Sequence, residues 1–144
     1  MWRVLSADAV LEIIFRFIGR PRDYESPHVD IVIDDGGHTF PQQIASFEKF
    51  YPHLQPQGVY LCEDIHTSVA PHFEGGYRRP GTFLEYSKGL IRPPDAWYTF
   101  EPERFAADPL TRSTYALHFY DSVLVIEKRP IPQPQQSLTG KPSF

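Results

Sequence analysis

Two short apolar runs that end abruptly in carboxylates constrain the fold of this chain more than any other feature. Residues 31–33 are all β-branched and precede two aspartates, and residues 59–62 precede a glutamate and an aspartate. Continuous apolar runs of this length suit strands that are buried on both faces. A helical pattern separates the runs, which predicts a strand–helix–strand unit with parallel strands. The carboxyl ends of both strands would then open at one edge of the sheet, where open α/β sheets bind ligands.

The segment between the two runs predicts a single helix. Thr39 is a suitable N-cap residue, with Gln42 as its capping-box partner and Pro41 in the first turn. Pro56 and Gly58 are expected to end the helix. The apolar stripe that faces the sheet is Ile44, Phe47, Phe50, Tyr51 and Leu54.

Further along the chain, the pattern predicts a loop, a second helix and a hairpin. Residues 65–79 have no periodicity and read as a long loop beside the edge that carries the carboxylates. Residues 115–120 and 122–128 read as two strands, which must be antiparallel because almost no chain separates them. The second helix, which Thr82 is expected to cap, faces the sheet with Phe83, Leu84, Leu90 and Ile91.

The two ends of the chain carry weaker signals. Residues 13–18 have the composition of a strand and stop at a glycine. Residues 130–144 are rich in Pro, Gln and Ser, and we expect them to form a disordered tail. The α/β domain is therefore expected to occupy residues 1–129.

Composition narrows the classes of function. The 144 residues are 41% hydrophobic and carry a formal net charge of −4, which suits one domain with its own core. Lys and Arg are scattered rather than clustered, so we expect no nucleic-acid partner. No apolar run approaches membrane-spanning length, and the first residues lack the layout of a signal peptide, so we expect no membrane partner. Cys62 is the only cysteine, which excludes an internal disulfide and favours a cytoplasmic, reducing location.

Five motifs, taken in order, carry a family likeness. They occupy residues 34–38, 54–60, 63–68, 73–83 and 118–128. Together they resemble one group of class I S-adenosylmethionine-dependent methyltransferases. This group contains the sugar O-methyltransferases of macrolide biosynthesis and their relatives, including proteins named cephalosporin hydroxylases.

The resemblance covers roughly residues 13–129 and implies a fold. The family has a Rossmann-like sheet of seven strands whose last two strands form an antiparallel hairpin. The family's first strand and its Gly-rich turn have no counterpart in this sequence. We therefore expect the C-terminal half of such an α/β fold: a partial parallel sheet plus the hairpin, with the N-terminal strands missing.

The resemblance also implies roles for the strand-end residues. Asp35, Glu63 and Asp64 would hold Mg²⁺, which prefers oxygen ligands. His38 would be the general base, because the unperturbed pKa of histidine lies near neutrality. The residues alone also allow a simpler interpretation. In it, the aspartates form only a polar turn, and His38 is a surface residue just before a helix.

A second set of residues would bind the cofactor S-adenosylmethionine. It comprises Asp23, Asp34, Gly36 and Gly37, and the two glycines are expected to allow positive φ and close approach of the backbone to a ligand. Asp34 has a second reading, in which it orients its neighbours or the backbone of the turn.

The implied function is metal-dependent O-methyl transfer from S-adenosylmethionine to a small-molecule hydroxyl acceptor, such as a sugar or another natural product. The alternative is a non-catalytic remnant or interaction module of the same fold. A third reading, a metal-dependent hydrolase or oxygenase, would use His38 and His66 with Asp35. A homo-oligomer is compatible with each of these readings.

Overall fold

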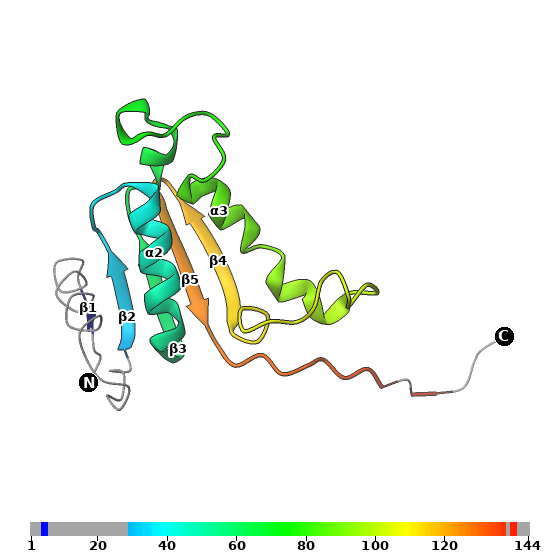
Figure 1. Ribbon diagram of the computed structural model, residues 1–144. Helices are drawn as coiled ribbons and strands as arrows, with labels where there is room; N and C mark the ends of the chain where they lie inside the picture. The colour runs from blue at the N-terminus through cyan, green and yellow to red at the C-terminus, as the bar shows by residue number, and fades with distance from the viewer. Residues whose placement is uncertain (1–3, 6–28, 138, 141–144) are drawn as a thin grey trace, which may run out of the picture.

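The computed structural model describes residues 4–5, 29–137 and 139–140. These residues form one five-stranded sheet in the order β1-β2-β3-β5-β4 (Figure 1). The first three strands run parallel, and β5 runs antiparallel to both of its neighbours. The strands are β1 (Val4–Leu5), β2 (Val29–Asp34), β3 (Leu54–Cys62), β4 (Thr114–Tyr120) and β5 (Val123–Lys128).

The predicted strand–helix–strand unit is confirmed. The helix α2 (Phe40–Phe50) connects β2 to β3, and these strands pair in parallel from Ile31 opposite Val59 to Asp34 opposite Cys62. A helical crossover is the usual way to join two adjacent parallel strands. β1 pairs with the other side of β2 over two residues. The predicted strand at residues 13–18 lies outside the described residues.

The helix ends earlier than the sequence pattern predicted. α2 stops at Phe50 and is followed by a short 3₁₀ turn, η1 (Tyr51–His53). Pro52 in this turn has no backbone N–H to continue the α-helical bonding, so the helix ends before it. Leu54, which was assigned to the apolar stripe of the helix, instead begins β3.

Pro56 and Gly58 were expected to end the helix and instead lie inside β3. The pairing with β2 slips here: Val29 is opposite Leu54, but Ile31 is already opposite Val59. The additional residues bulge out of the ladder, which lets a proline sit in the strand. Glycine is needed at position 58, because a Cβ there would lie 2.9 Å from the carbonyl oxygen of Asp30.

The two helix caps differ from each other. Thr82 caps α3 (Phe83–Gly89) as predicted, and its hydroxyl accepts a hydrogen bond from the backbone N–H of Glu85 at 3.4 Å. Thr39 is also an N-cap residue, but its hydroxyl donates to the side-chain oxygen of Gln42 at 2.7 Å and accepts no backbone N–H. The predicted capping box at Thr39 is therefore wrong.

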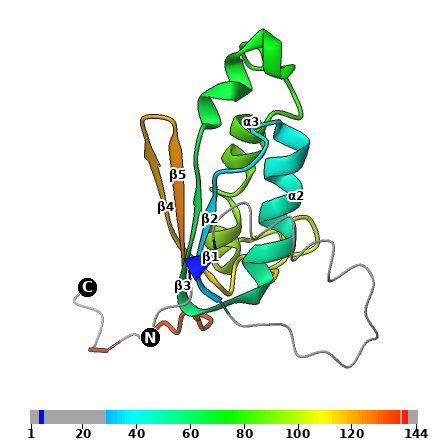
Figure 2. The same ribbon diagram turned by 90° about the vertical axis from the view of Figure 1, so that its left-hand side faces the viewer.

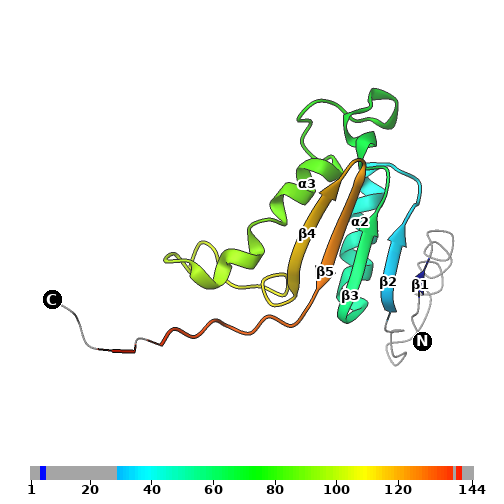
Figure 3. The same ribbon diagram turned by 180° about the vertical axis from the view of Figure 1, so that it is seen from behind.

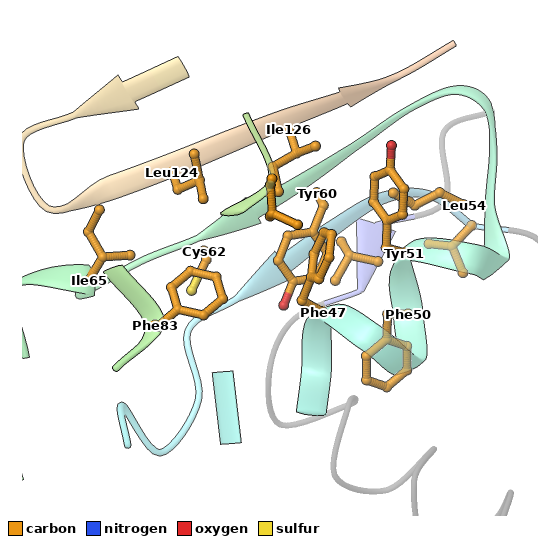
Figure 4. Packing of buried hydrophobic residues seen from close by; sticks show 13 residues of the cluster. Phe47, Phe50, Tyr51, Leu54, Tyr60, Cys62, Ile65, Phe83, Leu124 and Ile126 are labelled. Carbon is orange, nitrogen blue, oxygen red and sulfur yellow. The ribbon is translucent and has the colours of Figure 1, made fainter. Parts of the chain in front are cut away.

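The core lies on one face of the sheet. Figure 2 shows α2 and α3 on the same side of the strands. Figure 4 shows Phe47 of α2 and Phe83 of α3 against the strand residues, with Tyr60, Leu124 and Ile126 fully buried between them. Phe47 meets the ring of Tyr60 edge to face at 5.3 Å between centroids, a favoured geometry for aromatic pairs.

Ile91 was predicted to face this core, and that prediction is wrong. Its relative exposure is 52%, whereas Phe83 and Leu90 are buried as predicted. α3 ends at Gly89, so the helical spacing used to place Ile91 no longer applies two residues later.

The opposite face of the sheet carries the alternate residues of the same strands. Figure 3 views the molecule from this side, and the described part of the chain places no helix over it. Ile31, Ile33, Val59, Leu61 and Val125 on this face are each only partly buried.

The predicted hairpin is confirmed: β4 and β5 are antiparallel and are joined by Asp121 and Ser122. After β5, the backbone N–H of Ile131 donates to the carbonyl of Arg112 at 2.9 Å. Residues 132–137 then run on without helix or strand. None of the helices in the described part of the chain has the length and apolar character needed to cross a membrane.

Candidate metal and catalytic site

The carboxyl ends of β2 and β3 meet at one edge of the sheet, at the top of Figure 1. Asp34 and Cys62 are the last paired residues, and beyond them the backbone N–H of Glu63 donates to the carbonyl of Asp34 at 3.0 Å. This hydrogen bond keeps the two departing chains side by side. The side chains that follow each strand are therefore brought together, as the parallel arrangement predicts.

Three of the expected site residues form a compact group. Asp35, His38 and Asp64 each offer one ligand atom, and these atoms all lie within 4.8 Å of one another. His38 Nδ1 is 3.4 Å from Asp64 Oδ2, and His38 Nε2 is 4.0 Å from Asp35 Oδ1. The two carboxylates are 58% and 43% exposed, so the group faces solvent and a ligand could reach it.

Two of these residues adopt backbone conformations that most side chains avoid. His38 has φ +56° and Asp64 has φ +52°, both in the left-handed region. Non-glycine residues in this region carry a conformational cost, and such residues gather at functional sites. Their positions aim the imidazole and the carboxylate toward each other across the gap between the two strand ends.

Gly36 and Gly37 do not behave as expected. Positive φ was predicted at these glycines, but among the described glycines it occurs only at Gly81 and Gly140, and His38 takes the left-handed conformation instead. At Gly37 the constraint is space, because a Cβ there would lie 2.2 Å from the side-chain oxygen of Gln42. That amide is the end of a flexible side chain and could move.

Asp34 differs sharply from its neighbour Asp35. Its relative exposure is 4%, and its Oδ2 accepts a hydrogen bond from the hydroxyl of Tyr60 at 2.7 Å. Burial raises the pKa of the Asp34 carboxyl, although hydrogen bonds from Tyr60 and Ser46 oppose the shift. Asp34 thus lies on the core side of β2, where its hydrogen bond with Tyr60 links the end of β2 to β3.

The remaining predicted residues lie outside the compact group. Glu63 is partly buried and is not a member of the group, although its carbonyl oxygen accepts a hydrogen bond from Gln43 Nε2 at 3.1 Å. This bond ties α2 to the end of β3. Asp23 lies outside the described residues.

Two further residues, His66 and Ser122, approach the group. His66 Nδ1 lies 3.7 Å from Asp64 Oδ1 and 2.6 Å from the hydroxyl of Ser122. The third reading of the sequence groups His66 with His38 and Asp35, whereas the structure places it beside Asp64 and Ser122. Ser122 lies in the last of the five motifs, but no local pattern connects it with His66, which is 56 residues earlier in the chain.

The donor set fits a hard divalent cation. Two carboxylates supply the oxygen atoms that Mg²⁺ prefers, and Mg²⁺ commonly keeps waters or substrate in its other positions. An imidazole at the same place can accept or hold a proton. Metal binding and proton transfer are therefore both within the chemistry of this group.

Comparisons with known proteins point to one kind of enzyme, although no protein-family model matches the chain. The chain is 36% identical over 105 residues to 8-demethyl-8-alpha-L-rhamnosyl tetracenomycin-C 2'-O-methyltransferase of Streptomyces olivaceus, a match that covers 70% of this chain and 27% of the relative. It is 37% identical over 109 residues to mycinamicin VI 2''-O-methyltransferase of Micromonospora griseorubida, with 69% and 26% covered. This chain is a homologue of the macrolide and tetracenomycin sugar O-methyltransferases.

Solved structures agree with this homology. MycE methyltransferase from the mycinamycin biosynthetic pathway, in complex with Mg and SAH, superposes with a TM-score of 0.67 at 30% identity, covering 86% of this chain and 30% of that one. A MycE complex with Mg, SAH and mycinamycin VI gives a TM-score of 0.65 at 29% identity, covering 90% and 33%. This chain spans between 26% and 30% of the length of the curated relatives it matches.

Proposed function

We propose that this chain supplies the metal-binding and base-bearing edge of an S-adenosylmethionine-dependent O-methyltransferase that acts on a sugar hydroxyl of a natural product. The observation that carries the proposal is the convergence of Asp35, His38 and Asp64 at the ends of two parallel strands. The homologous methyltransferases support it, because MycE was solved with Mg and with SAH, the product that S-adenosylmethionine leaves.

In this proposal the carboxylates bind the cation. Asp35 and Asp64 would provide oxygen ligands from the two strand ends, with Glu63 as a third carboxylate beside them. A Mg²⁺ ion bound there would orient the acceptor oxygens and lower the pKa of the reacting hydroxyl. The partly exposed position of the carboxylates supports this role, since the acceptor must reach the ion from solvent.

His38 would take the proton from the acceptor hydroxyl. Its Nδ1 faces Asp64 Oδ2 at 3.4 Å, which favours the tautomer with hydrogen on Nδ1 and leaves the lone pair of Nε2 for the incoming proton. A positioned base of this kind contributes roughly 10²–10⁴-fold to the rate. Asp34, Gly36 and Gly37 remain proposed for binding S-adenosylmethionine. Asp34 would act indirectly, by orienting the backbone of the turn that follows β2.

Metal binding provides the first test. Titration of the 144-residue chain with Mn²⁺, followed by electron paramagnetic resonance, should show one site that Mg²⁺ displaces. Asp35→Asn and Asp64→Asn should each weaken binding about tenfold or more. Asp95→Asn is the matched control, because Asp95 is an exposed carboxylate on the separate 3₁₀ turn η4 (Pro93–Tyr98). Equal Mn²⁺ binding by all four proteins would remove the metal site.

Methyl transfer provides the second test. In a complete methyltransferase that carries this segment, supplied with S-adenosylmethionine, Mg²⁺ and a glycosylated macrolide as acceptor, His38→Ala should lower kcat about 10²-fold and change KM much less. Unchanged kcat would remove His38 as the base.

A further inference from the structure

The turn between β4 and β5 reaches the site from far along the chain. β5 lies directly beside β3, so the turn that begins β5 stands at the edge where β3 ends (Figure 1). The backbone N–H of Ile65 donates to the carbonyl of Ser122 at 3.1 Å. The side chain of Ile65 is itself buried in the core. The turn is thus fixed against the residue that follows Asp64.

A side-chain contact adds to this backbone contact. Ser122 has φ +61°, and its hydroxyl lies 2.6 Å from Nδ1 of His66. The side chain of His66 is 59% exposed, so surrounding atoms alone would leave its ring free to rotate. The hydroxyl of Ser122 holds the ring in one orientation.

In that orientation, the ring of His66 flanks the carboxylate of Asp64. His66 Nδ1 lies 3.7 Å from Oδ1, while His38 Nδ1 lies 3.4 Å from Oδ2, so each oxygen faces a different imidazole. The backbone of Asp64 is held separately, since its carbonyl accepts hydrogen bonds from the N–H and the hydroxyl of Thr67 at 3.0 and 2.8 Å. The remaining freedom of Asp64 lies in its side-chain torsions, and the ring of His66 stands beside Oδ1.

We propose that Ser122 is a positioning residue for Asp64, acting through His66. By holding the His66 ring beside Oδ1, it keeps Oδ2 directed toward His38 and Asp35, where the cation and the acceptor hydroxyl would meet. The proposal rests on the function proposed above. Residues that orient metal ligands from outside commonly change metal affinity 10- to 100-fold when they are removed.

Three variants separate this role from a purely structural one. Ser122→Gly removes the hydroxyl and suits the left-handed backbone, so the turn should stay folded. Ser122→Asn keeps a polar side chain and also tolerates this conformation, so it should restore much of the function. Gln57→Gly is the matched control, because Gln57 also has positive φ, at +75°, but lies within β3 far from the site.

The first measurement is the Mn²⁺ affinity of the whole chain. Ser122→Gly should raise the dissociation constant about tenfold, while Ser122→Asn and Gln57→Gly should stay within about threefold of the wild type. His66→Gln, which leaves the turn intact, should match Ser122→Gly and decides the question if that variant does not fold. An unchanged affinity in a folded Ser122→Gly protein overturns the proposal.

The second measurement needs no metal and separates this proposal from the proposed function. The ring ¹⁵N resonances of His38, recorded at one fixed pH, should shift in Ser122→Gly because the carboxylate between the two imidazoles turns. If the wild-type chain binds no Mn²⁺, the proposed metal function fails and this measurement alone decides. Unchanged His38 resonances would then overturn the role of Ser122, and shifted ones would support it.

Discussion

The two ends of β3 both carry polar groups, but these groups differ in whether they have hydrogen-bond partners within the protein. At the start of the strand, Lys128 Nζ donates to the carbonyl oxygens of Tyr51, Pro52 and Leu54 at 3.0, 2.9 and 2.8 Å. An ammonium group has three protons, and all three are used here. At the end of the strand, the carboxylates of Asp35 and Asp64 are partly exposed and have imidazole nitrogens of His38 and His66 as neighbours at 3.4 to 4.0 Å. At the start of β3 the backbone carbonyl groups are therefore hydrogen-bonded within the protein. At its end, carboxylate oxygens stay available to bind a ligand.

The largest effect on stability should come from the closed end. Lys128→Met would leave three carbonyl oxygens in η1 and at the start of β3 without their donor, so the free energy of unfolding should fall by about 3 kcal/mol. Urea denaturation at pH 7 measures this loss. Arg129→Met is the control, because its ion pair with the partly exposed Glu127 lies at the surface and such pairs contribute about 0.5 kcal/mol. A loss below about 1 kcal/mol for Lys128→Met would show that the start of β3 does not depend on these three hydrogen bonds.

A smaller effect is expected beneath the open end. Tyr60→Phe would remove the hydroxyl that donates to the buried Asp34, so the free energy of unfolding at pH 7 should fall by about 2 kcal/mol. Tyr86→Phe is the control, since that hydroxyl meets the exposed Glu48 at 3.3 Å. A loss no greater than in the control would show that Asp34 does not depend on Tyr60.

The same substitution has a pH dependence with a definite sign. Burial already raises the pKa of Asp34, so the folded state holds this proton more tightly than the unfolded state and stability falls as the pH rises above 3.8. The Tyr60 hydroxyl lowers that pKa, and removing it raises the pKa further. The loss in Tyr60→Phe should therefore be smaller at pH 4 than at pH 7, and equal losses at both values would contradict this reasoning.

The smallest effect on stability should come from the open end itself. Asp64→Asn keeps a residue type that tolerates the left-handed backbone, so the free energy of unfolding should change by less than about 0.5 kcal/mol. Asp64→Ala should cost about 1 kcal/mol, because alanine is disfavoured at this φ. Thermal unfolding of both variants measures the difference. Asp64→Asn losing as much stability as Lys128→Met would show that the open end is structural.

The sequence predicted the meeting of the strand ends but not the details of each carboxylate. Apolar runs followed by acids were sufficient to place Asp35, His38 and Asp64 at one edge, because parallel strands end together. The same reasoning did not separate Asp34 from Asp35, whereas side chains alternate across a sheet and Asp34, opposite Cys62, falls on the core side. Glu63 lies outside the compact group although it directly precedes Asp64, so its role as a third carboxylate stays a prediction.

Other features depend on long-range pairing that no local pattern encodes. The hairpin was predicted from its short turn. No local pattern indicated that β5, and not β4, would pair with β3. That insertion brings Ser122 to His66. The left-handed backbone at His38, beside two glycines that do not adopt it, was also hidden, because the propensity of glycine is a preference and the surrounding contacts decide.

The place of β5 in the sheet has a consequence for the order of synthesis. β3 carries the end that leads to Asp64, yet its neighbour β5 begins some sixty residues later in the chain. At a translation rate of about 5–20 residues per second, this side of β3 waits several seconds for its partner. During that interval a nascent chain presents an unpaired strand edge, a recognised starting point for association between chains. Slow or interrupted translation between β3 and β5 would therefore be expected to favour aggregation over assembly of the site.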